Sequence, residues 1–206
     1  MPRLVLLSDT HGQHDRIAVP DGDILIHAGD FCRFGRLGDI GVFNAWLATL
    51  PHKVKIVIAG NHELPLEDMP EPARGLLTDC VYLQDQSHEA FGLKFYGSPW
   101  QPRFFDWAFN ANPDKLREVW ARIPDDTDVL ITHSAPSGIL SASKELRECG
   151  CGELRARLEN ISPKLHVFGH IHESYGRLER NGTTHINASI CNADYEPVNP
   201  PVIIDL

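Results

Sequence analysis

Short apolar runs recur along the chain of 206 residues, and each ends abruptly in polar residues. A run of four or five β-forming residues that stops at glycine or a polar side chain is typical of a buried strand. Such a strand delivers polar groups to the edge of a sheet. The pattern predicts five strands of this kind, at residues 4–7, 23–27, 54–58, 128–131 and 164–168.

Helical spacing is found between these runs. Phe43, Trp46, Leu47 and Leu50 predict a helix over residues 37–50, which Pro51 would end. We expect two more helices, one from Asn112-Pro113 to Pro124 and one over residues 153–160. The prolines at positions 65, 70 and 72 indicate an irregular segment, with one short helix around residues 73–77.

The remaining apolar segments indicate further strands. Residues 81–83 and 93–96 are expected in a second sheet, with a turn at 87–92, and residues 183–189 and 201–205 add further strands. Residues 97–107 form a loop rich in Trp and Phe. This loop packs against the body or lines a pocket, where Trp100 could stack on a nucleobase or another flat group.

Charge and composition narrow the classes of partner. The net charge of −9 argues against stable binding to a nucleic-acid duplex, although bound cations would still allow a small phosphorylated substrate, with nucleotides among the candidates. No apolar run approaches the ~18 residues of a membrane span. The five scattered cysteines favour free thiols in a reducing compartment. We therefore expect a cytoplasmic protein with no membrane association, and the oligomeric state stays open.

The polar residues at the five strand ends share one chemistry. Asp9 and His11 are two positions apart, as are His170 and His172, so each pair shares a face of an extended chain and can share a cation. Because open α/β sheets place their sites at the carboxyl ends of strands, the five ends should meet. Together they supply seven candidate ligands, which exceeds the about four to six that one transition metal needs and fits two metals with a bridging carboxylate. The seven are Asp9, His11, Asp30, Asn61, His133, His170 and His172.

Other histidines are expected to play structural roles. His27 and His166 lie within strands and should be hydrogen-bonded in the core. We expect His14, His52, His88 and His185 at the surface or beside the site.

The ordered set of motifs resembles the calcineurin-like metallophosphoesterase superfamily, whose pattern is D-x-H, G-D, G-N-H-[DE], a later His and G-H-x-H. A closer resemblance, to the metallophosphoesterase-domain-containing (fetal brain 239-type) class III phosphodiesterases, covers nearly the whole chain. It is carried by residues 97–100, 163–173, 186–189 and 199–201. The resemblance implies an α/β (α+β) fold in four layers, αββα, with two mixed β-sheets flanked by helices, in a single domain over residues 1–206.

The resemblance also implies a division of the ligands between two metals. Asp9, His11 and His172 would bind one metal, Asn61, His133 and His170 the other, and Asp30 would bridge them. Manganese is the first choice, and Fe, Co, Ni and Zn suit the same mixed ligands.

The expected activity is hydrolysis of phosphodiesters, with cyclic nucleotides among the candidate substrates. A hydroxide between the metals would attack phosphorus in line with the leaving alkoxide. His62, adjacent to a ligand but surplus to the metal set, is the candidate proton donor, and Glu63 either orients its neighbours or is a solvated charge. We expect Asp30, Asn61 and His62 in catalysis and Asn61, His62 and Trp100 in substrate binding. The alternatives are a phosphomonoesterase or protein phosphatase of the same superfamily, and a non-catalytic scaffold on this fold.

Overall fold

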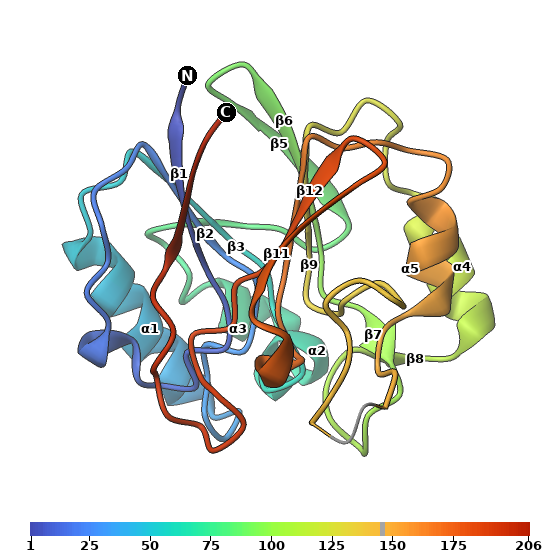
Figure 1. Ribbon diagram of the computed structural model, residues 1–206. Coiled ribbons are helices and arrows are strands. Elements are labelled where there is room, and N and C mark those ends of the chain that lie inside the picture. Colours follow the sequence, from blue (N-terminus) through green and yellow to red (C-terminus); the bar gives the residue numbers. More distant parts are fainter. Residues whose placement is uncertain (145–146) are drawn as a thin grey trace.

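Two β-sheets pack face to face at the centre of the molecule, and helices cover the outer face of each (Figure 1). The computed structural model describes residues 1–144 and 147–206. The first sheet has the strand order β13-β1-β2-β3-β4, and the second has the order β11-β12-β10-β9-β6-β5.

The first sheet is mixed. Four of its strands run parallel, namely β1 (Arg3–Leu7), β2 (Ile24–His27), β3 (Val54–Val57) and β4 (Val81–Tyr82). The strand β13 (Val202–Asp205) pairs antiparallel with β1, so that Arg3 faces Asp205.

The second sheet is mixed as well. Its central strands β6 (Leu93–Ser98), β9 (Val129–Thr132), β10 (Leu165–Phe168) and β12 (Thr183–Asn187) are parallel. The two edge strands, β5 (Gln86–Ala90) and β11 (Gly176–Arg180), pair antiparallel with their neighbours.

Successive side chains along each strand point to opposite faces of the sheet, and this alternation creates the layers. In β1, Leu4 and Leu6 belong to the core between the two sheets, whereas Val5 and Leu7 face the opposite side. On that outer side they pack with Phe43 of α1 (Leu37–Thr49). Because both faces of the strand are covered, β1 is a continuous apolar run instead of an alternating one.

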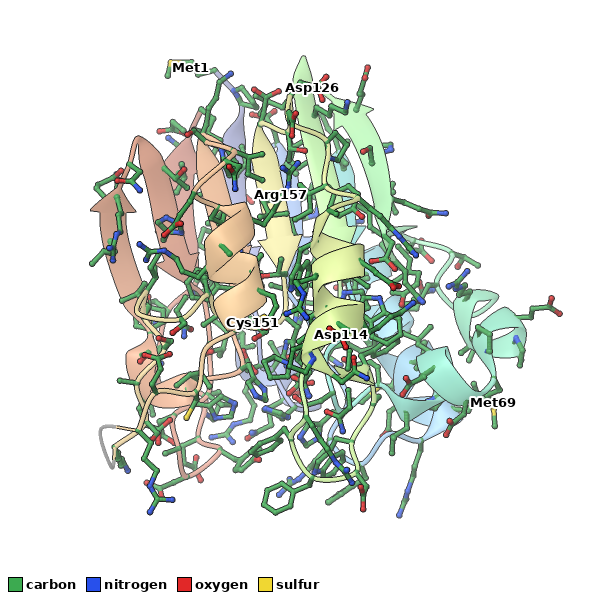
Figure 2. All side chains as sticks on the ribbon, turned by 90° about the vertical axis from the view of Figure 1, so that its right-hand side faces the viewer. Met1, Met69, Asp114, Asp126, Cys151 and Arg157 are labelled. Atoms are coloured by element: carbon green, nitrogen blue, oxygen red, sulfur yellow. The ribbon has the colours of Figure 1, made fainter. Side chains whose placement is uncertain are left out.

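The second sheet is covered in the same way on its own outer face. The helices α4 (Pro113–Trp120) and α5 (Gly152–Arg157) lie side by side across it (Figure 2). Trp120 and Leu154 of these helices pack with Leu130 of β9. The four-layer αββα fold expected from the resemblance is therefore confirmed.

The predicted helix over residues 37–50 is confirmed as α1, and the second is confirmed as α4, with the Asn112 side chain accepting the N–H of Lys115 at 2.9 Å. The segment 64–74, expected to be irregular, forms two short helices, α2 (Leu64–Asp68) and α3 (Pro70–Arg74). Pro65 and Pro70 fall in the first turn of each helix, where proline is favoured because no N–H is needed there.

Two strand predictions were wrong. Residues 81–82 form β4 in the first sheet, and residues 86–90 form β5 where a turn was expected. The strand β5 lies at the sheet edge and is largely polar, so it lacks the apolar pattern of a buried strand. The aromatic loop contains the first of two very short strands, β7 (Gln101–Pro102) and β8 (Asn110–Ala111), which pair with each other.

Three of the remaining histidines are more buried than expected. His14, in the short 3₁₀ helix η1 (His14–Arg16), is buried, as are His52 and His185. His185 contacts His166, whose other ring nitrogen lies 2.9 Å from Thr132 Oγ1. In the part of the chain that the structure describes, no helix is long and apolar enough to cross a membrane.

Candidate metal centre

The two sheets are joined directly where β1 ends. The Ser8 N–H donates to the Ala188 carbonyl at 2.9 Å, and the Ile190 N–H donates to the Ser8 carbonyl at 2.8 Å. Ala188 and Ile190 follow β12 of the second sheet. This junction brings the strand ends of both sheets together, as the sequence predicts for the carboxyl ends of parallel strands.

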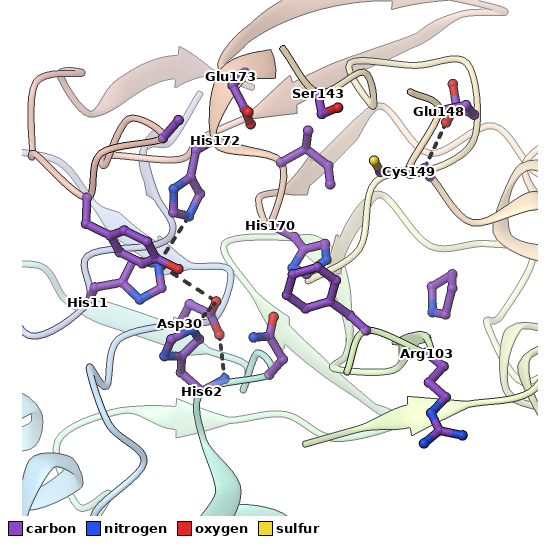
Figure 3. Close-up of a pocket in the computed structure, with 17 residues that line it drawn as sticks. His11, Asp30, His62, Arg103, Ser143, Glu148, Cys149, His170, His172 and Glu173 are labelled. Atoms are coloured by element: carbon purple, nitrogen blue, oxygen red, sulfur yellow. Dashed lines mark hydrogen bonds and ion pairs between the residues drawn. The ribbon is translucent and has the colours of Figure 1, made fainter. Parts of the chain in front are cut away.

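Asp9, His11 and His172 form the first cluster at this junction, with one potential ligand atom from each lying within 4.8 Å of the others. His11 Nε2 lies 3.1 Å from His172 Nε2 (Figure 3). His172 Nε2 also lies 3.3 Å from Asp9 Oδ1. His172 begins the 3₁₀ helix η2 (His172–Ser174) that follows β10.

Asp30, His133 and His170 form the second cluster under the same criterion. His133 Nε2 lies 3.4 Å from Asp30 Oδ2 and 3.0 Å from Asn61 Oδ1. Asp30 also belongs to a third group, with His11 and His62, so its carboxylate faces both clusters. The structure therefore brings all seven predicted ligands together.

Main-chain carbonyls orient two of the imidazoles. His172 Nδ1 donates to the Asn192 carbonyl at 3.0 Å, and His133 Nδ1 donates to the Ala28 carbonyl at 2.9 Å. A carbonyl can only accept, so each Nδ1 carries the proton and each Nε2 faces the cluster. A backbone acceptor behind a ring in this way is the usual arrangement for a metal-binding histidine.

Four candidate ligands have left-handed backbones. The φ angles are 53° at Asp9, 44° at His11, 57° at Asp30 and 68° at His170. This region is uncommon for residues other than glycine, and such residues cluster at functional sites where the surrounding structure holds them. The strand ends therefore turn sharply so that their side chains converge.

Glycines in the motifs permit the close packing. A Cβ atom at Gly60 would lie 2.6 Å from His133 Cε1 and would collide with Asp30 Oδ1. A Cβ atom at Gly169 would collide with Asp9 Oδ2 and lie 2.7 Å from Ser8 Cβ. Any larger residue at either position would displace a candidate ligand, which explains why both motifs have glycine there.

Glu63 is fully buried, so the reading of this residue as a solvated charge was wrong. Its Oε2 accepts the N–H of Asp30 at 2.8 Å and the N–H of Gly60 at 2.6 Å, while Oε1 accepts the N–H of Cys32 at 2.8 Å. One carboxylate thus joins the loop after β2 to the loop after β3.

Protonation in this centre follows burial and the charges of neighbours. Burial lowers the pKa of His11 to about 4 and that of His170 to about 3, so both rings are neutral and can act as ligands near pH 7. Burial disfavours the charged form of His133 as well, but the adjacent Asp30 raises its pKa to about 9. Burial would raise the pKa of Asp9, but the hydrogen bond from His172 lowers it below its ordinary value.

Burial raises the pKa of Glu63 to about 7, with the charge of Asp30 adding to the effect. The hydrogen bonds that Glu63 accepts from Cys32 and Gly60 act in the opposite direction.

His62 lies beside the two clusters. Its Nδ1 donates to the Arg33 carbonyl at 2.9 Å, which leaves Nε2 on the side of Asp30, 3.9 Å from Oδ2. Its main-chain N–H donates to Asp30 Oδ1 at 2.8 Å.

Trp100 lies apart from these residues. Its indole N–H donates to Asp85 Oδ2 at 2.9 Å, and its ring packs edge-on against Phe109. Two aromatic residues that the sequence reasoning did not single out lie at the centre. Tyr195 contacts His11 at 4.8 Å between ring centroids, and Trp107 stacks on His62 at 4.4 Å. Neither residue belongs to a strand-end motif, so no local signal identifies it.

A cavity of ≈ 550 Å³ opens over the centre. Phe104 of the aromatic loop forms part of its wall and meets the His170 ring edge-on at 5.1 Å. Figure 3 shows the labelled histidines His11, His62, His170 and His172 turned toward the same space as Asp30. Six predicted site residues line this cavity, namely His11, Asp30, Asn61, His62, His170 and His172.

This donor set fits divalent cations. It combines imidazole nitrogens with carboxylate oxygens, and the first and second clusters supply three ligand atoms each within 4.8 Å. In addition, His11 Nε2 and His172 Nε2 face each other with the Asp9 carboxylate beside them. Buried nitrogen and oxygen atoms that converge in this way are satisfied by a shared cation.

The four-layer fold and the histidine–aspartate centre at its junction define a calcineurin-like phosphoesterase. The family model of that description matches residues 2–174, and the chain belongs to this family of hydrolases, which typically bind divalent metals. The chain is 44% identical over 230 residues to metallophosphoesterase domain-containing protein 1 of Homo sapiens, with 99% of this chain and 71% of the relative covered. The Mus musculus protein of the same name has the same identity and coverage.

Solved structures share the fold at much lower identity. One aligns with a TM-score of 0.73 at 15% identity over 91% of this chain and 90% of its own. A protein of Thermus thermophilus aligns with a TM-score of 0.62 at 13% identity, covering 90% of this chain and 88% of its own. At these identities the likeness is one of fold.

Proposed function

We propose that this phosphoesterase hydrolyses phosphodiesters and uses two divalent cations held by the seven clustered residues. The observation that supports two cations is the presence of two separate ligand clusters, with Asp30 of the second cluster also within reach of His11 of the first. Asp9, His11 and His172 would hold one cation and Asn61, His133 and His170 the other, with Asp30 shared between them. When bound, the cations would polarise the phosphoryl oxygens and supply a nucleophile from water near neutral pH. Manganese is the first metal to test, followed by Fe, Co, Ni and Zn.

His62 is the proposed proton donor to the leaving alkoxide. The Arg33 carbonyl occupies its Nδ1, so Nε2 is the nitrogen free for proton transfer. The residue is 7% exposed and lines the cavity, which gives a substrate access to it. Asn61, on the preceding position, lines the same cavity and would contact the phosphate.

A small diester, with nucleotides among the candidates, suits the cavity of ≈ 550 Å³. The wall contributed by Phe104 offers an apolar surface to a leaving group. The buried Cys32, Cys151 and Cys191, all free thiols, support a reducing compartment and thus the cytoplasm.

A substrate panel tests the proposal. Metal-free protein is loaded separately with Mn, Zn, Ni and Co, and metal content is measured alongside hydrolysis of cyclic nucleotides, bis-p-nitrophenyl phosphate and p-nitrophenyl phosphate. We expect bound metal and faster turnover of diesters than of the monoester. Faster monoester turnover would assign a phosphomonoesterase, and no turnover with any metal would assign a non-catalytic scaffold.

A further inference from the structure

Trp107 lies flat against His62, with ring centroids 4.4 Å apart and an angle of 21° between the ring planes. We propose that Trp107 is a positioning residue, which holds the His62 imidazole so that Nε2 points into the cavity. The proposal rests on the proposed function, because it gives Trp107 its effect through His62.

The His62 ring is restrained on several sides. Its Nδ1 donates to the Arg33 carbonyl at 2.9 Å, and the His11 ring packs against it in a T-shaped arrangement, with ring centroids 4.5 Å apart and an interplanar angle of 72°. Trp107 supplies the parallel face contact. Terminal torsions of imidazole rings are broad, so a single hydrogen bond leaves the ring free to rock about it. A large flat ring against one face removes that freedom.

The segment that carries Trp107 is fixed to the segment that carries His62. The Ala108 N–H donates to the Asn61 carbonyl at 3.1 Å, and the Phe109 N–H donates to Glu67 Oε2 at 2.8 Å. Ala108 and Phe109 are both buried in the core outside the first sheet. The indole therefore has a fixed base from which to restrain the imidazole.

Trp107 acts from outside the cavity. Among the described residues that line the cavity over the centre, Trp107 is not found, whereas His62 is. An indole N–H is a donor only, so Trp107 is not a metal ligand either. Its removal should therefore leave substrate binding and metal content in place and change proton donation alone.

The leaving group offers a readout specific to proton donation. A diester with a p-nitrophenolate leaving group needs little protonation, because that anion is stable near neutral pH, whereas an unsubstituted phenolate or an alkoxide needs a proton. We suggest a series of methyl aryl phosphodiesters with increasingly basic leaving groups. Wild type, Trp107→Leu, Trp107→Phe and His62→Ala are compared under saturating manganese. Trp46→Leu is the matched control, because Trp46 is also half-buried but packs on His14 and Phe43.

We expect Trp107→Leu to lower kcat about 10-fold for the methyl phenyl ester and less than about 2-fold for the p-nitrophenyl ester, a part of the effect of a general acid. KM should stay unchanged, Trp107→Phe should restore most of the loss, and Trp46→Leu should show no dependence on the leaving group. In the His62→Ala background, Trp107→Leu should have no further effect on the slope of log kcat against leaving-group basicity.

Two results would overturn the proposal. One is an equal loss of kcat on every ester in Trp107→Leu, and the other is an independent, additive change of slope in the double variant. If His62→Ala itself leaves the slope unchanged, His62 is not the proton donor. This result refutes the proposed role of His62 and is distinct from the two results that refute the role of Trp107.

A spectroscopic measurement keeps the contact testable without turnover. In metal-free protein with labelled histidine, stacking on an indole shifts the ring-proton resonances of His62 upfield. The shift should disappear in Trp107→Leu and persist in Trp46→Leu. An unchanged His62 resonance in Trp107→Leu would show that the stack does not hold the ring.

Discussion

The Glu63 carboxylate binds the main chain of Asp30, with Oε2 accepting the Asp30 N–H at 2.8 Å. The same oxygen accepts the Gly60 N–H at 2.6 Å. Glu63 lies in the loop after β3, so this loop holds the main chain of Asp30, which follows the neighbouring strand β2. Glu63 does not line the cavity, yet it can in this way determine where the Asp30 carboxylate lies.

Replacing Glu63 with Gln should disturb this connection. The amide has one acceptor oxygen in place of two, so at least one buried N–H loses its partner, at a cost of about 1–3 kcal/mol. We expect the free energy of unfolding to fall by this amount and the affinity for manganese to fall with it. Urea denaturation of metal-free protein and metal titration measure the two quantities, with the exposed Glu71→Gln as control. Unchanged metal affinity would mean that Glu63 stabilises the loops without positioning Asp30.

If the proposed function holds, the variant His62→Ala should retain the wild-type metal content and slow diester cleavage by a factor of ~10²–10⁴, the usual scale of general acid–base catalysis. His62 stands outside the two clusters assigned to cations, so elemental analysis should give the wild-type metal content. Wild-type kcat in this variant would exclude His62 as the proton donor.

Asp30→Asn should lose metal and activity together. The Asp30 carboxylate lies within reach of His11, His62, His133 and His170, and an amide carries neither the charge nor the second anionic oxygen. The measurement is metal content after dialysis against a defined trace of manganese. Full occupancy in Asp30→Asn would argue against a shared carboxylate.

The stability of the metal-free protein should fall on acidification, and His27 should contribute to the loss. Burial lowers the pKa of His27 from 6.5 to about 3, so the unfolded chain binds a proton in this window that the folded chain does not. Stability is therefore present above pH 6.5 and lost as the pH falls toward 3.

The titration of His27 should change the unfolding free energy by about 1.4 kcal/mol per pH unit, the value for one proton. His27→Leu should reduce the pH dependence of the unfolding free energy by that amount between about pH 6 and pH 4. Urea denaturation at a series of pH values measures it, and an unchanged slope in the variant would contradict the assignment.

The centre could be predicted from the sequence because every candidate ligand lies within a few residues after one of five apolar runs. Leu4 to Leu7 and Asp9 illustrate this, since the strand is recognisable locally and the polar residue marks its end. That the ends meet follows from the general placement of sites at the carboxyl edge of parallel sheets.

What could not be predicted depends on contacts distant in sequence. The segment 81–82 is a strand by composition, but only its pairing with Ile56 and Val57 puts it in the first sheet. Glu63 has the same local pattern whether its carboxylate is solvated or bound to main-chain N–H groups. Trp107 and Tyr195 come from irregular segments, where spacing carries no information on direction.

The distribution of the ligands along the chain has a consequence for biosynthesis. Asp9 precedes His172 by more than three quarters of the sequence, yet the two contact each other in one cluster. During synthesis, Asp9 would emerge from the ribosome long before His172. Bringing the two together closes a long loop of chain, which is a slow, non-local folding step. We therefore expect the candidate ligand set to be complete only late in maturation, and a nascent chain that stops before His170 would have only part of it.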